Sequence, residues 1–386
     1  MHMRARSSSR IRNTLIAVPA LLPLLAVSAA HASGFNVANL VTNSQPANAA
    51  QIADPNLVNA WGISFSPSGP FWVSDNGTGL STLYKVDPST NTTSIIPLVV
   101  TIPGDGSVTG QAFNGNAASF NGDAFLFTSE DGTISGWRGA LGTTAETLQS
   151  GLAANVYKGT TLASVAGNDY LLAANFGTGS VDVLKGHSGE PDLTGHFTDG
   201  SLPSGYAPFN IHNLGGRLFV TYALKGSGKD EVDALGDGYV DEFDTNGNFI
   251  ARIASGGALD APWGLALAPA SFGDLAGDLL VGNFGNGTIE AIDLATNTSD
   301  GLLTDRTGQT LVIDGLWALT PGNDGSAGSS KAIYFSAGPN GESNGLFGVI
   351  EGVPEPATWI EMLIGIAGAG ALYRRRHWIP RKLRTA

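Results

Sequence analysis

The chain has 386 residues, a formal net charge of −13 and no cysteine, so it forms no disulfide bond, thiolate metal site or cysteine nucleophile. Its 53 glycines and its low content of charged residues, 14%, are typical of short strands joined by tight turns. Residues 33–353 contain 10 Lys and Arg against 31 Asp and Glu, and such an acidic body excludes nucleic acid as a partner because it repels phosphate.

Residues 1–32 have the three parts of a secretory signal peptide. Four arginines lie between residues 4 and 12, an apolar run follows at residues 15–30, and Ala30-His31-Ala32 matches an A-x-A cleavage site. We therefore expect export with removal of residues 1–32. A retained membrane anchor is the alternative, but Pro19 and Pro23 interrupt the apolar run and favour the cleaved signal.

The segment at residues 35–42 alternates apolar and polar side chains like a strand, although it precedes the repeats that follow. We predict that it completes the last blade of a closed ring, residues 317–351, because closure removes open sheet edges. A loosely attached N-terminal arm is the alternative.

The body at residues 33–351 repeats one pattern of strands and glycine turns. Residues 263–293 begin with Trp-Gly, continue with a strand around Leu279 and Val281, turn at Phe-Gly-Asn-Gly, and end in a second strand. Residues 61–87 repeat this order. Weaker copies begin at Phe113, Tyr157, Phe209 and Trp317. Six copies with a period of about 50 residues predict an all-β, six-bladed β-propeller.

The middle strand of each copy is apolar. We predict these strands at residues 71–73, 125–129, 170–175, 218–222, 279–281 and 332–337. Trp61, Trp263 and Trp317 begin three of the copies, and we expect them to pack between neighbouring blades. A ring of aromatic side chains that lines a ligand channel is the alternative.

Polar residues recur where the middle strands end, at Asp75, Glu130, Asn175 and Asn283. Equivalent positions of successive blades can meet at one face of a propeller, and oxygen ligands of this kind suit Ca²⁺. The competing interpretation is turn capping, because Asp and Asn are favoured before glycine. His212 is a further candidate, since it lies in the innermost-strand region of the fourth copy; a purely structural histidine is the alternative.

The loop at residues 225–238 is the longest polar insertion in the repeats. It carries Asp230, Glu231, Asp233 and Asp237 among glycines, so it is a second candidate for calcium, with a solvated surface loop as the alternative. No G-x-S-x-G nucleophile motif occurs in a strand-turn-helix setting, and we assign no catalytic residue.

Three features follow one another in residues 352–386. Pro354-Glu355-Pro356 precedes an apolar segment at residues 357–373, which only Glu361 interrupts, and Arg374, Arg375 and Arg376 come next. At ~1.5 Å per helical residue the segment reaches about 25 Å, which predicts a short single transmembrane helix with a cytoplasmic basic tail.

This three-part constellation resembles PEP-CTERM sorting signals. The resemblance implies export through the inner membrane of a Gram-negative bacterium, where the helix anchors the precursor. It also implies processing near Pro354-Glu355-Pro356 by an exosortase, and release to the cell surface or an exopolysaccharide matrix.

The body resembles a family of conserved hypothetical proteins that often carry this tail and are similar to NHL-type six-bladed propellers. The resemblance lies in residues 57–62 (LVNAWG), 74–79 (SDNGTG) and 314–319 (DGLWAL). It implies no established activity. Six-bladed calcium-dependent lactonases, similar at the level of fold, place Asp, Glu and Asn ligands in a comparable way.

Together these features favour an exported surface or extracellular-matrix propeller that binds polysaccharide or protein without catalysis. The alternative is a calcium-dependent hydrolase or lactonase at the channel mouth, in which the metal would activate water. A purely structural biofilm component is a third interpretation.

Overall fold

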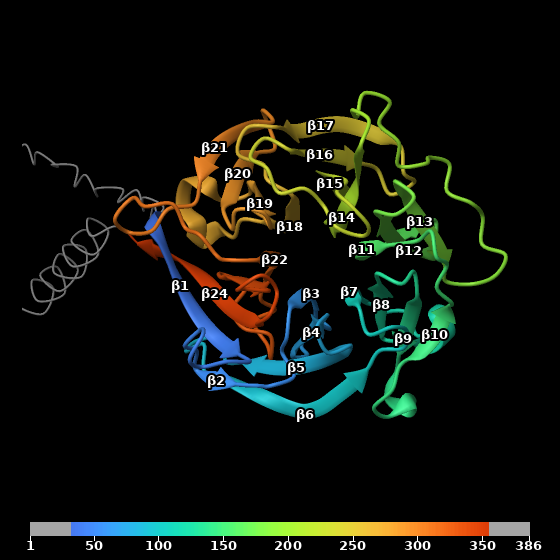
Figure 1. Cartoon of the computed structure of the whole chain (residues 1–386), viewed down its shortest axis with the longest axis horizontal. Coiled ribbons are helices and arrows are strands. Elements are labelled where there is room, and N and C mark those ends of the chain that lie inside the picture. The colour runs from blue at the N-terminus through green and yellow to red at the C-terminus, as the bar shows by residue number, and fades with distance from the viewer. Residues whose placement is uncertain (1–31, 355–386) are drawn as a thin grey trace, which may run out of the picture.

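The computed structural model describes residues 32–354, in which strands form six sheets around a central axis (Figure 1). The predicted signal peptide up to His31, with Ala30, lies outside the described residues. So do Glu355, Pro356, the predicted membrane segment and Arg374 to Arg376. The predicted all-β, six-bladed propeller is confirmed.

The blades are numbered in chain order, and their strands are given from the axis outward. Blade 1 contains β3 (Ala60–Ser64), β4 (Phe71–Asp75), β5 (Leu80–Val86) and β6 (Thr93–Thr101). Blade 2 contains β7 (Val108–Phe113), β8 (Phe125–Ser129), β9 (Ile134–Trp137) and β10 (Glu146–Gln149). Blade 3 contains β11 (Tyr157–Val165), β12 (Asn168–Asn175) and β13 (Ser180–Lys185).

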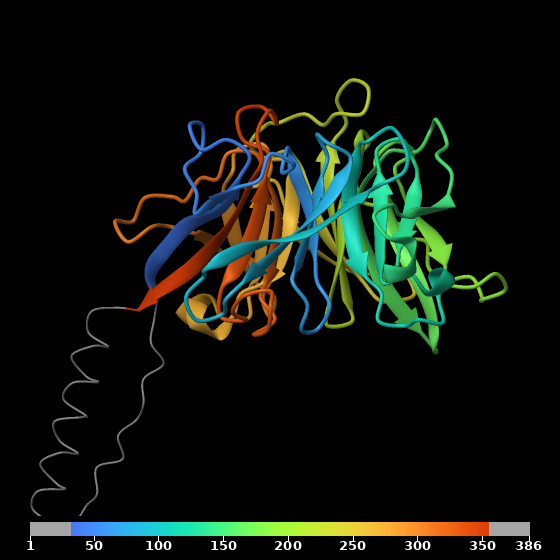
Figure 2. The same ribbon diagram turned by 90° about the horizontal axis from the view of Figure 1, so that it is seen from below.

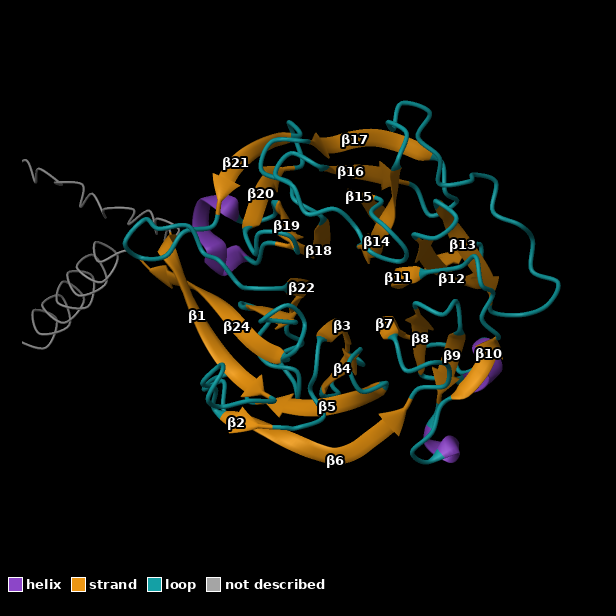
Figure 3. Ribbon diagram, in the orientation of Figure 1, coloured by secondary structure: helices purple, strands orange, loops and turns teal. Residues whose placement is uncertain are grey.

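Blade 4 contains β14 (Tyr206–Leu214), β15 (Arg217–Leu224), β16 (Gly238–Phe243) and β17 (Phe249–Ser255). Blade 5 contains β18 (Pro262–Leu267), β19 (Leu279–Asn283), β20 (Ile289–Asp293) and β21 (Thr298–Leu302). Blade 6 contains β22 (Leu316–Pro321), β23 (Ile333–Ala337), β24 (Leu346–Pro354), β1 (Ala32–Thr42) and β2 (Ile52–Ala53). Short 3-10 helices lie in the connections at Phe120–Gly122, Gly139–Leu141 and Ala270–Leu275 (Figure 3).

All six predicted middle strands are confirmed. Every residue of β8, β19 and β23 is buried, because each middle strand is covered by a neighbouring blade on both faces. This double burial explains why these strands are nearly continuous apolar runs rather than alternating ones. The hydrophobic core is therefore divided among the blade interfaces: one cluster joins Leu280 of blade 5 to Leu319 and Phe335 of blade 6.

The N-terminal strand closes the ring, as predicted. Strand β1 pairs antiparallel with β24, with Val37 opposite Ile350. The first and last described residues, Ala32 and Pro354, are backbone partners, so the end of the predicted signal peptide lies beside the start of the predicted sorting motif. The short β2 then pairs parallel with β1. Blade 6 thus joins strands from both ends of the chain and leaves β24 without a free edge.

The propeller has two distinct faces (Figure 2). We name the face on which the innermost strands begin the distal face, and the face on which they end the proximal face. Because neighbouring strands of a blade are antiparallel, β24 ends on the proximal face, and β1 begins there as its partner. Among residues 32–354 no helix has the length and apolar character needed to cross a membrane.

Candidate functional site

Six equivalent residues meet at the distal end of the axis. Near the start of each innermost strand a β-bulge follows one pair with the end of the middle strand, as Ala60 with Asp75 and Tyr157 with Asn175. In blade 4 the corresponding pair, directly before the β-bulge, is Pro208 with Tyr222. The residue that follows this pair in each blade is Trp61, Thr109, Lys158, Phe209, Trp263 or Trp317.

The three tryptophans contact one another at the axis. The rings of Trp61 and Trp317 are stacked with centroids 3.6 Å apart, and Trp263 meets Trp317 edge-on at 5.8 Å. Phe284 stacks on Trp317 at 3.9 Å. None of the three tryptophans is more than 4% exposed. Each ring thus packs against a tryptophan of a neighbouring blade, as expected, and the three rings form one buried cluster at the distal end of the innermost strands.

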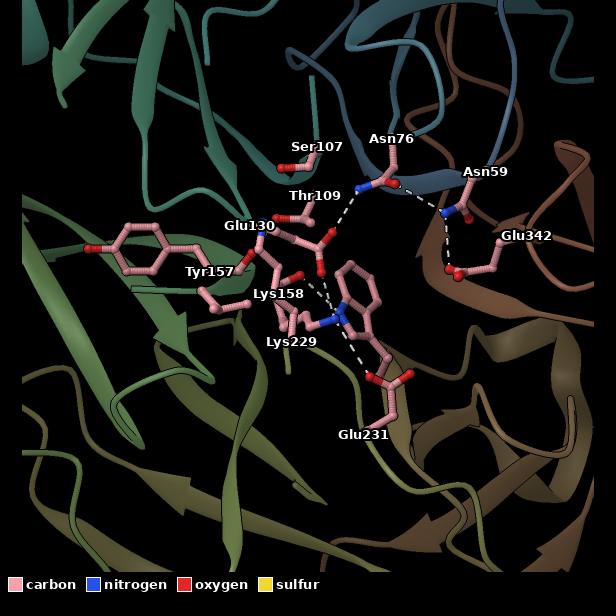
Figure 4. A network of polar contacts seen from close by, with 12 residues as sticks. Asn59, Asn76, Ser107, Thr109, Glu130, Tyr157, Lys158, Lys229, Glu231 and Glu342 are labelled. Carbon is pink, nitrogen blue, oxygen red and sulfur yellow. Dashed lines mark hydrogen bonds and ion pairs between the residues drawn. The ribbon is translucent and has the colours of Figure 1, made fainter. Parts of the chain in front are cut away.

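A buried lysine lies beside this tryptophan cluster (Figure 4). The Lys158 Nζ is 2.7 Å from Glu130 Oε1 and 3.6 Å from Glu231 Oε2, and it lies 5.1 Å from the centroid of the Trp61 ring. The Lys158 side chain is only 3% exposed. Burial alone lowers the pKa of the ammonium, but Glu130 and Glu231 outweigh burial and leave this pKa above its usual value. Lys158 therefore stays charged and acts as the counterion of two carboxylates.

The carboxylates around Lys158 differ in their partners. Burial raises the pKa of Glu231 to about 7, against the attraction of Lys158. Glu342 has a pKa raised by burial, and its Oε1 accepts a hydrogen bond of 3.0 Å from Asn59 Nδ2. The same amide nitrogen lies 3.2 Å from Asn76 Oδ1, and Asn76 Nδ2 is 3.5 Å from Glu130 Oε2. A single polar network, centred on Lys158 of blade 3, thus spans blades 6, 1, 2, 3 and 4 on the distal face.

The loop between β15 and β16 covers part of this network. Its Glu231 side chain pairs with Lys158. The Lys229 Nζ of the same loop lies 3.5 Å from Oδ2 of Asp105, which lies in the connection between β6 and β7. Asp237 Oδ1 accepts a hydrogen bond of 3.0 Å from the Tyr206 hydroxyl. Glu231 and Asp237, two of the four carboxylates predicted to share a calcium ion, are therefore directed to separate partners. Within residues 32–354 no group of three or more His, Asp or Glu side chains is placed to hold a metal.

The predicted convergence of Asp75, Glu130, Asn175 and Asn283 is not found, and the reason is register. Asp75, Asn175 and Asn283 are the last residues of their middle strands, whereas Glu130 comes one residue later than its equivalent, Ser129. A shift of one residue in a strand turns the side chain to the opposite face. The residues equivalent to Glu130 that contact the axial cluster are Asn76, Phe176 and Phe284.

Asn175 and Asn283 cap turns. Asn175 Oδ1 accepts hydrogen bonds from the backbone N–H groups of Val156 and Thr178, at 3.1 and 3.2 Å. Asn283 Oδ1 accepts from the Asp260 N–H at 3.0 Å, and its Nδ2 donates to Ala258 O at 3.2 Å. These contacts agree with the competing interpretation, in which the two side chains cap turns that precede glycine.

Asp75 is fully buried, and neither carboxylate oxygen accepts a hydrogen bond of standard geometry from the described residues. Burial raises its pKa well above the usual value. A protonated Asp75 is the form that such an environment favours, and a neutral carboxylic acid is a poor ligand for Ca²⁺. Only Glu130 of the four candidates reaches the axis, where it pairs with Lys158.

His212 lies at the opposite end of the channel. It lines a pocket of about 390 Å³ formed by the later residues of the innermost strands, so this proximal pocket is separate from the Lys158 network. The His212 Nδ1 is 2.9 Å from the Leu265 carbonyl oxygen, and burial lowers the pKa of the imidazole. Sequence reasoning located this residue near the channel but gave no sign of the pocket.

The chain is similar over most of its length to proteins of Acanthamoeba polyphaga mimivirus. It is 32% identical to the uncharacterized protein R648 over 329 residues, which cover 80% of this chain and 78% of the viral protein. It is 31% identical to the uncharacterized protein L690 over 322 residues, which cover 76% and 80%. The chain belongs to the family of these two proteins. No protein-family model matches it.

Two solved structures are similar to this chain at low sequence identity. Aldose sugar dehydrogenase of Streptomyces coelicolor is 16% identical, with a TM-score of 0.45, and covers 83% of this chain and all of its own. A nidogen/laminin complex chain is 12% identical, with a TM-score of 0.42, and covers 68% and 85%. At these identities the likeness concerns the fold alone. Because R648 and L690 are themselves uncharacterized, function in this family has to be argued from the site.

Proposed function

We propose that this chain is an exported propeller that binds a polysaccharide or a protein at the cell surface or in the extracellular matrix, without catalysis. The observation that carries the proposal is the ion pairing of the charged side chains beside the tryptophan cluster. Lys158 forms ion pairs with Glu130 and Glu231 in a nearly closed environment, so the three side chains are engaged with one another. The rigid closed ring is suited to binding because little ordering is needed when a ligand arrives.

The hydrolase alternative receives less support from the geometry. A metal-dependent hydrolase needs several oxygen ligands around one point and an open position for water. Here Asn175 and Asn283 are engaged in turns, and Asp75 is enclosed. These residues do not fit a calcium ion, so no step of a reaction is derived through one.

Retention on matrix polysaccharide tests the binding function. Exopolysaccharide from a matrix-forming Gram-negative bacterium would be immobilised, and the purified full-length protein in a detergent without sugar head groups would be passed over it. We expect retention above that of an unrelated protein of similar acidity, because recognition should exceed what an acidic surface gives. Equal elution of the two proteins, repeated with immobilised surface proteins as bait, would remove the binding function.

Export and sorting are part of the proposal. Its support is the order of signal peptide, body and PEP-type tail, together with the adjacent positions of Ala32 and Pro354 on the proximal face. This arrangement lets an anchored precursor present its distal face away from the inner membrane, before an exosortase releases it.

Replacing Pro354, Glu355 and Pro356 by alanine is expected to leave the precursor in the inner membrane. The physical reason is that the apolar segment at residues 357–373 would remain attached and hold the protein in the bilayer. Cell fractionation with immunodetection measures the distribution, and a triple alanine variant at residues 244–246 in the Asp244 turn serves as the control. Normal surface release of the tail variant would contradict the sorting proposal.

A further inference from the structure

We propose that the proximal pocket binds a neutral, polyhydroxylated ligand, and that the terminal sugar of a polysaccharide is the ligand class it fits. This inference rests on the proposed binding function and assigns that function a site. The pocket volume of about 390 Å³ lies within the range of small-ligand sites and admits a ligand of monosaccharide to disaccharide size.

The lining of the pocket carries no formal charge at neutral pH. It contains no Asp, Glu, Lys or Arg, and its polar side chains are hydroxyls, amides and one imidazole: Ser64, Gln111, Thr160, Thr161, His212 and Asn213 among them. An ionised ligand would lose its hydration here without meeting a counter-charge, which is costly. A negatively charged ligand would also meet the field of a body with 31 acidic and 10 basic residues. Neutral ligands are therefore favoured.

Two side chains of the pocket keep hydrogen-bonding capacity for a ligand. The Leu265 carbonyl can only accept, so His212 Nδ1 carries the proton, and the neutral ring leaves Nε2 as an acceptor without a partner among the described residues. Thr161 Oγ1 accepts a hydrogen bond of 3.1 Å from the Asn213 N–H, so its own hydroxyl hydrogen remains available as a donor. An acceptor and a donor on adjacent blades match a hydroxyl-rich ligand.

The remaining polar groups hold the pocket in shape. Gln111 Nε2 donates to the carbonyls of Gly62 and Trp72, at 2.7 and 2.6 Å, and Asn213 Nδ2 donates to Leu162 O at 2.8 Å. Phe65 and Phe113 also line the pocket and supply apolar surface for the C–H face of a sugar ring. Small-ligand sites commonly combine apolar lining residues with a few polar groups that orient the ligand.

The channel below the pocket is closed. A void of only about 30 Å³ lies next to it, lined by His212, Leu265 and Trp263, and Trp263 belongs to the tryptophan cluster at the distal end. A polymer therefore has no route through the ring. The geometry favours recognition of the end of a chain, or of a free small sugar, at the proximal mouth.

Ligand-observed NMR on the full-length protein in an amine-oxide detergent tests the site. The probes are glucose, galactose and N-acetylglucosamine, with glucuronate as the charged comparison. We expect saturable binding of at least one neutral probe and weaker binding of glucuronate. His212→Phe is expected to weaken binding by about tenfold through loss of one acceptor, and Thr161→Val should weaken it as well. His196→Phe, at an exposed histidine outside the pocket, should leave it unchanged.

The outcomes separate the site from the function. Absence of saturable binding for all neutral probes would overturn the pocket assignment, as would binding that His212→Phe and Thr161→Val leave unaltered in folded protein. If His212→Phe does not fold, as judged by its melting curve, Thr161→Val decides. Retention on polysaccharide that survives both substitutions would keep the proposed function and place its ligand elsewhere on the propeller.

Discussion

Lys158→Met is expected to lower the free energy of unfolding by about 3–5 kcal/mol, because it leaves two buried carboxylates without their counterion. Glu130 and Glu231 are 14% and 8% exposed at the side chain, so water cannot replace the ammonium. Methionine preserves much of the volume and the contacts with Trp61 and Phe176, which isolates the loss of charge. Guanidinium unfolding followed by tryptophan fluorescence measures the change.

The expected loss depends on the carboxylates, and this dependence provides the controls. Adding Glu130→Gln to Lys158→Met should restore part of the stability, since one uncompensated charge is removed. Lys85→Met, at an exposed position of β5, should change the stability by no more than about 0.5 kcal/mol. A loss for Lys158→Met no larger than that of Lys85→Met would show that the network contributes nothing to the fold.

The architecture could be predicted from the sequence because each blade repeats its own local signals. The apolar middle strands, the glycine turns and the strand at residues 35–42 all occur where the structure has them. Such features depend on short stretches of chain, and strand burial on both faces leaves a clear apolar run. The closure strand was predictable for a different reason: a ring requires a partner for its last edge.

The site was harder to predict, because it depends on register. Three of the predicted copies begin with tryptophan, at Trp61, Trp263 and Trp317, and these three positions are equivalent in the structure. Phe209 is equivalent to them, as predicted, whereas in blades 2 and 3 the equivalent residues are Thr109 and Lys158 instead of the predicted starts Phe113 and Tyr157. The predicted start of the third copy, Tyr157, lies one residue before Lys158, so the sequence alignment of the blades does not place this lysine at the position of the tryptophans. Aligning blades on the Trp-Gly start alone would have revealed Lys158-Gly159.

Contacts between distant loops could not be predicted from the sequences of single strands. Glu231 and Glu342 reach the axis from loops of blades 4 and 6, and neither loop has a repeat partner that predicts its path. The acidic loop at residues 225–238 suggests a metal site by its composition, yet its Glu231 pairs with the ammonium group of Lys158. The acidic composition of the loop therefore indicates a positively charged partner, but not that this partner is a lysine side chain.

A disulfide across the closure strand is expected to stabilise the ring by up to about 5 kcal/mol, because it would join residues at opposite ends of the body and so restrict the unfolded chain. Asn36 of β1 is the register partner of Glu351 in β24, and both side chains are exposed. The chain has no cysteine of its own, so Asn36→Cys/Glu351→Cys introduces the only possible pair. Guanidinium midpoints of the oxidised and reduced forms measure the gain.

The same experiment tests the register that closes the ring. Val37 pairs with Ile350, so Val37→Cys/Glu351→Cys places two thiols on opposite faces of the sheet, and this pair should remain reduced under the same oxidation. Asn36→Cys alone controls for the substitution itself. If the off-register pair crosslinked as readily as the matched pair, β1 would not be held in one register. If the matched pair crosslinked without raising the midpoint, closure by β1 would not limit unfolding of the propeller.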